Sequence, residues 1–182
     1  MADPPTKLLV GISGFLETER RPSGIEDILW QVFSEIEHVA TARFLWSDSI
    51  VTMVRLVRRI VEKWPSIEVN ILGYSYGGST ATQLVDALRP IAIANLFLID
   101  PVWRPFRHFP SFLSIYGMGT LWVEANVERC HVWRQRTTII RGCKVARRAD
   151  LTTLWEDTIN RRHSQIDNST HIKGAIIERL AA

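Results

Sequence analysis

The chain has 182 residues, of which 46% are hydrophobic and 23% are charged, and its formal net charge is +3. This length and composition predict one globular domain over residues 1–182, with a single hydrophobic core. No apolar run approaches the roughly 20 residues that a membrane-spanning helix needs, and the first residues lack a secretory signal pattern, so we expect a cytoplasmic protein.

The first third of the chain alternates between strand and helix patterns. A strand is predicted over Lys7 to Ile12, and it runs into the glycine-bearing segment from Gly11 to Phe15. A helix follows at about residues 25–36, with Ser23 and Glu26 at the spacing of a capping box. A second strand at about residues 39–45 and a second helix at about residues 48–63 complete this part.

The stretch from Ile67 to Pro90 places a serine on a sharp turn. The apolar, largely β-branched residues Ile67, Val69, Ile71 and Leu72 predict a buried strand, which stops at Gly-Tyr-Ser-Tyr-Gly, residues 73–77. A helical pattern begins at once and ends before Pro90. The small residues Gly73 and Gly77 allow close packing of strand and helix, so the pattern predicts a nucleophile elbow with Ser75 at its tip.

The order of these elements predicts the architecture. A fourth strand is expected over Ile93 to Ile99, and it ends at Asp100 and Pro101. Short connections between alternating strands and helices predict a mostly parallel sheet with helices on both faces, a three-layer α/β/α sandwich. The carboxyl ends of parallel strands share one sheet edge. The segment from Gly11 to Phe15, Ser75 and Asp100 all follow predicted strands, so we expect them to meet at this edge.

The last part of the chain is less regular. Aromatic residues are dense between Val102 and Val123, where they either line a substrate groove or seal the sheet edge. A fifth strand is predicted near residues 129–137. Residues 142–167 are polar and arginine-bearing, and we expect loops there with a short helix near residues 151–158. A final helix follows His171.

Ser75, Asp100 and His171 stand in the chain order Ser, Asp, His, and Ser75 lies within Gly-x-Ser-x-Gly. In these features the sequence resembles the α/β-hydrolase superfamily. The resemblance covers most of the chain and is strongest from Lys7 to Pro101. It implies a minimal, lipase- or esterase-like fold without the usual first strands or a large cap domain. The expected core strand order is 2-1-3-4-5 in this chain's numbering.

The resemblance also implies the roles of the site residues. Ser75 would be the nucleophile, His171 the general base and Asp100 the acid that orients the base. His163 is the main alternative base, whereas the remaining histidines suit surface or packing positions. These remaining histidines are His38, His108 and His131. The later acids Asp150, Asp157 and Asp167 are alternatives to Asp100, although none follows a clear predicted strand.

An oxyanion hole is expected from backbone N–H groups. One belongs to Tyr76, and the other comes from Phe15 or Gly14 in the loop after the first strand. This loop reads Gly-Ile-Ser-Gly-Phe and lacks the His-Gly pair common in lipases, so the Ser13 hydroxyl is a further candidate donor. The same glycines do not complete a nucleotide-binding motif.

The resulting hypothesis is a serine hydrolase that cleaves an ester or related acyl bond of a small-molecule or lipid-like substrate. Neither a metal nor an organic cofactor is expected, and Cys130 and Cys143 are read as ordinary thiols. The alternative is a catalytically inactive member of the same fold that serves as a binding or assembly module. A third class, an arginine-rich binder of nucleic acid, would require the arginines on one face. The substrate and the oligomeric state are not determined by the sequence.

Overall fold

The computed structural model describes residues 3–15, 24–104, 117–138 and 141–182. Within these ranges the main sheet has the strand order β2-β1-β3-β4-β6-β8. Its strands are β1 (Lys7–Ile12), β2 (Val39–Phe44), β3 (Glu68–Tyr74), β4 (Ile93–Ile99), β6 (Val127–Arg134) and β8 (Thr153–Thr158). All neighbouring strands of this sheet pair in parallel. The predicted order is confirmed for the first five of these strands, because the expected fifth strand is β6.

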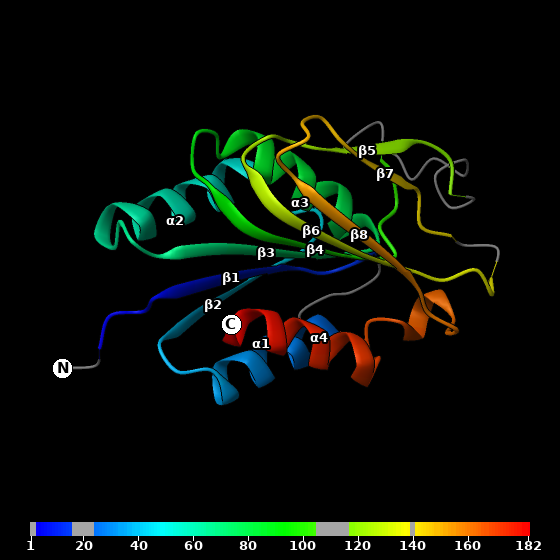
Figure 1. Cartoon of the computed structure of the whole chain (residues 1–182), viewed down its shortest axis with the longest axis horizontal. Coiled ribbons are helices and arrows are strands. Elements are labelled where there is room, and N and C mark those ends of the chain that lie inside the picture. Colours follow the sequence, from blue (N-terminus) through cyan, green and yellow to red (C-terminus); the bar gives the residue numbers. More distant parts are fainter. Residues whose placement is uncertain (1–2, 16–23, 105–116, 139–140) are drawn as a thin grey trace.

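Helices cover both faces of the sheet, as Figure 1 shows. The helices α2 (Ile50–Lys63) and α3 (Tyr76–Ala87) lie on one face, and α1 (Gly24–Glu35) and α4 (Thr170–Ala181) lie on the other. Alternate residues of a strand point to opposite faces, so β4 supplies Leu96 and Leu98 to one core and Phe97 to the other. The predicted three-layer α/β/α sandwich is therefore confirmed.

The region after β4 differs from the sequence prediction. Residues 153–158, expected to lie in a short helix, form β8, which pairs in parallel with β6 at the edge of the sheet. Most of β8 is exposed, and only Leu154 is half-buried, so the strand lacks the alternation that marks a strand in sequence. Pairing with β6 decides its conformation.

A second, smaller sheet was also not predicted. It pairs β5 (Thr120–Val123) with β7 (Lys144–Arg147) in parallel and lies on the α3 side of the main sheet (Figure 1). Leu121, Val123 and Val145 point into the core beneath it. Residues 105–116, which hold most of the predicted aromatic segment and His108, lie outside the described residues, and so does Ser23 of the predicted capping box.

Cys130 and Cys143 are both free and buried, which agrees with their interpretation as ordinary thiols. None of the helices in the described ranges is long and apolar enough to cross a membrane.

Candidate active site

Ser75 occupies the turn between β3 and α3 with a strained backbone. Its φ of 54° and ψ of −121° lie in a region that non-glycine residues seldom adopt. The backbone is held on both sides, because Ser75 N–H donates to the Ile99 carbonyl oxygen at 3.0 Å and its own carbonyl oxygen accepts from Val102 N–H at 2.9 Å. The predicted elbow geometry is therefore present, and β4 supports it from the neighbouring position in the sheet.

Two glycines make this turn sterically possible. A Cβ on Gly77 would lie 2.3 Å from the carbonyl oxygen of Ile12 and 2.5 Å from that of Ser13, so α3 begins directly against the end of β1. A Cβ on Gly73 would lie 2.6 Å from the Gly77 carbonyl oxygen. Larger residues at either position would push the helix away from the sheet.

Asp100 lies at the end of β4, as the sequence predicts, and it is fully buried. Its Oδ1 accepts hydrogen bonds from the N–H groups of Gly142 at 2.9 Å and Gln135 at 3.3 Å. Its Oδ2 accepts from the Gln135 side-chain amide at 3.1 Å. These donors compensate for the burial of a carboxylate and fix its plane.

His163 connects this carboxylate to the serine. Its Nδ1 lies 2.6 Å from Asp100 Oδ2, and its Nε2 lies 2.9 Å from Ser75 Oγ. The histidine begins a single turn, η1 (His163–Gln165), which follows β8 at the carboxyl edge of the sheet. Tyr74 stacks on its imidazole and donates a 2.6 Å hydrogen bond to its backbone carbonyl oxygen.

This arrangement determines what the imidazole can do. A buried carboxylate accepts hydrogen bonds, so the Asp100 contact favours the tautomer that carries its proton on Nδ1 of His163. The lone pair of Nε2 then faces the Ser75 hydroxyl, where it can accept the hydroxyl proton. The three side chains together form a Ser-His-Asp arrangement, in which an imidazole contacts both a serine hydroxyl and a buried carboxylate.

His171, the base expected from the sequence, does not take part in this arrangement. It is the second residue of α4, where its side chain is exposed, and the ring nitrogens of His163 already contact Ser75 and Asp100. The sequence favoured His171 because its pattern did not reveal β8. With β8 in place, His163 is the histidine that follows the last strand of the sheet.

The alternative acids lie elsewhere. Asp150 is exposed and pairs with Arg147, and Asp157 is exposed on β8. Asp167 is buried and accepts a 2.8 Å hydrogen bond from the N–H of Gly24, the first residue of α1, so it satisfies a donor at the start of that helix. Burial raises the pKa of the Asp167 carboxyl.

Two of the residues predicted for the oxyanion hole, Gly14 and Tyr76, lie next to Ser75. A Cβ on Gly14 would lie 3.1 Å from the Cβ of Ser75, so the loop after β1 contacts this serine. Tyr76 is the first residue of α3, and the first N–H groups of a helix have no partner within the helix. The hydroxyl of Ser13 is buried and has no hydrogen-bond partner among the described residues.

An aromatic cluster lies beside this loop. The rings of Phe15, Trp46 and Tyr76 contact one another with centroids 5.4 to 5.7 Å apart. The buried guanidinium of Arg104 lies over Trp46, 5.0 Å from the ring centroid. Phe15 remains 40% exposed. The cluster was not predicted as a unit, because its members come from the ends of β1 and β2 and the start of α3.

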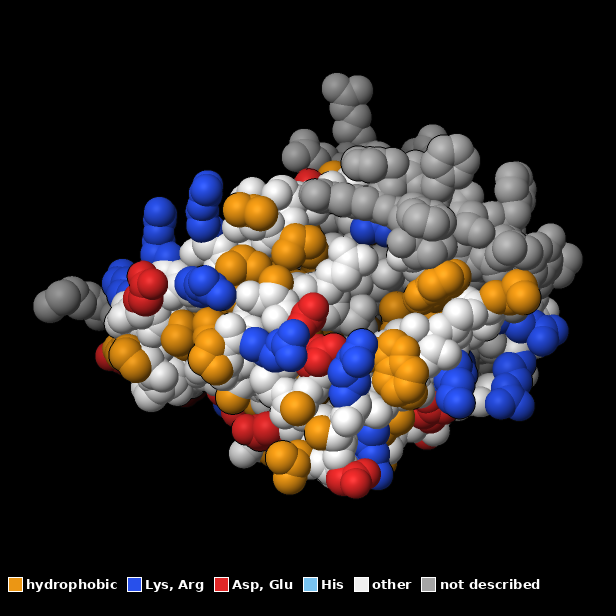
Figure 2. All heavy atoms as spheres, turned by 90° about the horizontal axis from the view of Figure 1, so that it is seen from above, with side chains coloured by type: hydrophobic (Ala, Val, Ile, Leu, Met, Phe, Trp, Pro, Cys, Tyr) orange, Lys and Arg blue, Asp and Glu red, His pale blue; other side chains and the backbone are white. Residues whose placement is uncertain are grey.

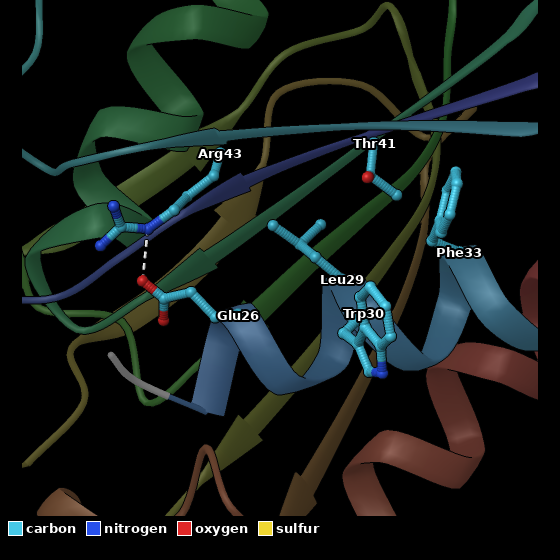
Figure 3. Close-up of a pocket in the computed structure, with 6 residues that line it drawn as sticks. All are labelled: Glu26, Leu29, Trp30, Phe33, Thr41 and Arg43. Atoms are coloured by element: carbon cyan, nitrogen blue, oxygen red, sulfur yellow. Dashed lines mark ion pairs between the residues drawn. The ribbon is translucent and has the colours of Figure 1, made fainter. Parts of the chain in front are cut away.

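A separate hollow lies on the face of the sheet that α1 covers, away from Ser75. It has a volume of about 390 Å³ and lies between α1 and β2, with Trp30 and Phe33 at its rim (Figure 3). Glu26 and Arg43 form an ion pair at one end. None of the residues that line it belongs to the Ser-His-Asp arrangement.

Charged side chains of both signs share the face seen in Figure 2. Lys and Arg side chains there alternate with Asp, Glu and hydrophobic side chains. Several arginines of the chain pair with carboxylates, including Arg89 and Arg148, which both contact Glu124. This visible face is therefore not a continuous basic surface of the kind that nucleic-acid binding requires. Among the described residues no group of three or more His, Cys, Asp or Glu side chains could hold a metal ion.

Comparisons with known proteins identify the fold. No protein-family model and no curated protein matches the sequence. The esterase domain of a Rhodothermus marinus protein superposes with a TM-score of 0.59 at 10% identity, over 98% of this chain and 88% of that chain. The chain has an α/β-hydrolase fold. A putative hydrolase from Agrobacterium vitis S4 gives a TM-score of 0.57 at 10% identity, over 98% of this chain and 89% of the other.

A third structure with the α/β-hydrolase fold is the NocB thioesterase domain, solved as a covalent complex with a fluorophosphonate nocardicin G analog. It superposes with a TM-score of 0.53 at 14% identity, over 98% of this chain and 95% of that domain. Identities this low establish the fold alone. The chemistry of this α/β-hydrolase-fold chain must therefore be argued from its own side chains.

Proposed function

We propose that this protein is a serine hydrolase that cleaves an ester, thioester or related acyl bond. The observation that carries the proposal is the position of His163, whose two ring nitrogens contact Ser75 Oγ at 2.9 Å and Asp100 Oδ2 at 2.6 Å. Serine is a weak nucleophile near neutral pH and needs a base within hydrogen-bond reach. His163 meets that requirement, and Asp100 orients it.

The reaction follows from these contacts. Ser75 Oγ attacks the acyl carbon while its proton passes to Nε2 of His163, and the positive imidazolium is stabilised by the Asp100 carboxylate. The bond from the acyl carbon to the leaving oxygen or sulfur then breaks, and His163 returns the proton to the leaving atom. Water, deprotonated by His163, attacks the acyl-enzyme, and the acid product and the free serine are released.

The negative oxygen that forms in each step needs hydrogen-bond donors. We propose the backbone N–H of Tyr76 and an N–H from the loop at Gly14 and Phe15, with the buried Ser13 hydroxyl as a further donor. The contact between Gly14 and Ser75 and the position of Tyr76 at the start of α3 support this assignment. The positive end of the α3 dipole adds to the stabilisation.

The acyl part of the substrate would contact the aromatic cluster of Phe15, Trp46 and Tyr76. These rings lie next to the proposed oxyanion hole, and Phe15 is partly open to solvent. Apolar rings of this kind bury small acyl or lipid-like groups. The esterase and thioesterase activities named for the structural neighbours support an acyl substrate class.

Covalent labelling by a fluorophosphonate probe tests the proposal. The probe should label the wild-type protein, and Ser75→Ala should abolish labelling. Ser79→Ala is the matched control, because Ser79 is also a buried serine of α3 and lies one turn further along. Labelling that persists in Ser75→Ala would contradict the assignment. A wild-type protein that is never labelled would favour the inactive binding or assembly module.

A further inference from the structure

A polar pocket adjoins the segment that carries His163. It has a volume of about 400 Å³ and is lined by Thr137, Asn160, Arg161, Arg162 and Gln165. The lining therefore offers two guanidinium groups and two side-chain amides, and it contains no carboxylate. Such a set of donors matches an anion rather than a cation or an apolar group.

The positive charges of this pocket are not used within the protein. Neither Arg161 nor Arg162 forms an ion pair or a side-chain hydrogen bond with any described residue, and both side chains are exposed. Arg147, by contrast, pairs with Asp150 at 3.2 Å. The two guanidinium groups are thus available to an external ligand.

The pocket walls are tied to the active-site network. The Thr137 hydroxyl donates a 2.7 Å hydrogen bond to the Arg161 carbonyl oxygen, and the same hydroxyl contacts Oε1 of Gln135 at 3.2 Å. Gln135 in turn holds Asp100. The segment of residues 160–165 therefore has a defined position relative to the triad, and a ligand bound in the pocket is placed on the histidine side of the site.

The histidine side of the site is where the leaving group departs in the proposed reaction. His163 must return its proton to the leaving oxygen or sulfur, so the leaving group has to lie next to Nε2 of His163. The acyl carbonyl oxygen would lie in the proposed oxyanion hole at Gly14 and Tyr76. An anion held by residues next to His163 would therefore belong to the leaving group.

We propose that this pocket binds a phosphate group on the leaving alcohol or thiol of the substrate. The inference rests on the proposed hydrolase function and names its substrate class. Two arginine side chains can each donate two parallel hydrogen bonds to a phosphate, whose charge of about −1.5 to −2 they balance. The amides of Asn160 and Gln165 add neutral donors. Because the pocket is open to solvent, it can admit a phosphate that is attached to the reacting ester through a linker.

The experiment compares matched substrates. These are butyryl esters of ethylene glycol, butanediol and hexanediol, each with its second hydroxyl either free or phosphorylated, so that linker length is varied. An ethyl ester of phosphonooxybutanoic acid places the phosphate on the acyl side instead. For at least one linker length, the kcat/KM of the wild type should be about tenfold or more higher for the phosphorylated ester than for its unphosphorylated partner. The difference should come mostly from a lower KM, as expected for two charge-assisted contacts at an exposed site.

Paired variants locate the effect. Arg161→Gln combined with Arg162→Gln should remove the preference and leave hydrolysis of the unphosphorylated esters unchanged. Arg55→Gln combined with Arg59→Gln removes the same charge from the exposed face of α2 and should keep the preference. Equal kcat/KM for both members of every pair, or a preference only for the acyl-side phosphate, would overturn the inference while the hydrolase assignment stands.

A binding measurement separates this inference from the failure of the proposed function. Calorimetric titration of Ser75→Ala with butanediol monophosphate should show binding that is absent for butanediol and lost in the combined arginine variant. Inorganic phosphate should bind at the same residues. If the wild type is neither labelled by the fluorophosphonate nor active, the hydrolase proposal falls, and the titration alone decides whether the pocket binds phosphate. The absence of butanediol monophosphate binding would overturn the proposal that this pocket binds phosphate.

Discussion

The ring of Tyr74 stacks on the imidazole of His163 with centroids 5.4 Å apart, and its hydroxyl donates a 2.6 Å hydrogen bond to the backbone carbonyl oxygen of the same residue. Tyr74 directly precedes Ser75, so one residue of the elbow holds the histidine that the serine needs. The proposed nucleophile and its proposed base are thus positioned by the same turn, although they lie 88 residues apart in the chain.

Replacement of Tyr74 should separate these two contacts. Tyr74→Phe keeps the ring and removes the hydrogen bond, so we expect a loss of about 1 kcal/mol in the free energy of unfolding and a small loss in turnover. Tyr74→Leu also removes the stacking and should lower kcat further. Tyr76→Phe is the control, because the buried Tyr76 hydroxyl has no described partner. Equal kcat for Tyr74→Leu and the wild type would argue against a positioning role.

The two candidate histidines give a direct comparison. His163→Ala removes the side chain that contacts Ser75, and it should reduce ester turnover by roughly two to four orders of magnitude, the usual contribution of a general base. His171→Ala changes an exposed residue of α4 and should leave turnover and thermal stability nearly unchanged. Steady-state kinetics on both purified variants checks this. A severe loss in His171→Ala alone would overturn the assignment of His163.

Gln135 is expected to position the acid. Its amide donates to Asp100, while its Oε1 accepts from the N–H groups of Thr137 at 2.9 Å and Thr138 at 3.1 Å. Gln135→Ala removes a hydrogen bond to a charged group, so kcat/KM should fall about 10- to 100-fold. Gln135→Glu places a second carboxylate beside Asp100 and should shift the pH profile of kcat, because like charges raise the pKa of one of them.

The control for Gln135 is Gln83→Ala, which changes an exposed glutamine of α3. Its kinetics should match those of the wild type. If Gln135→Ala lost stability but kept the pH profile and kcat of the wild type, the residue would have a structural role only.

The packing of α3 against β1 predicts the cost of a methyl group at Gly77. The added Cβ would lie 2.3 Å from the carbonyl oxygen of Ile12, which is backbone and cannot rotate away. Gly77→Ala should therefore lower the free energy of unfolding by about 1–3 kcal/mol and reduce labelling of Ser75. Gly174→Ala is the matched control, since its Cβ meets nothing within 4 Å and alanine should stabilise α4 by up to about 1 kcal/mol. Thermal and urea unfolding compare the two.

A buried histidine predicts part of the pH dependence of stability. The pKa of His131 is lowered to about 4, first by burial and then by the charges of Arg179 and Arg129. The unfolded chain, with an ordinary histidine pKa near 6.5, therefore binds more protons between about pH 4 and 6.5. Stability contributed by neutral His131 should be complete above about pH 6.5 and be lost as the pH falls to about 4.

His131→Gln removes this titration and should flatten the stability profile between pH 7 and 4.5, as measured by urea unfolding at each pH. Asp167 acts in the opposite direction, because burial raises its pKa and the folded state then binds the proton more readily than the unfolded state. The difference between wild type and variant isolates His131. Parallel profiles would contradict the lowered pKa.

Local sequence patterns were enough to predict a large part of this fold. Buried strands such as Ile93–Ile99 are mostly apolar, and the glycines around Ser75 are required by a turn in which strand and helix touch. The alternation of these elements was sufficient to predict a parallel sheet, its order over the first five strands, and the meeting of Ser75 with Asp100 at one edge.

The histidine that contacts Ser75 depends on strand pairing between segments that are distant in sequence. Strand β8 is an exposed edge strand whose conformation depends on pairing with β6, so Thr153–Thr158 carries no alternation that its sequence could reveal. Without that strand, His163 is assigned to a polar loop, and His171 is the better candidate for the general base. The same limit applies to Gln135 and Arg161, because hydrogen bonds between segments distant in sequence leave no periodic pattern within either segment.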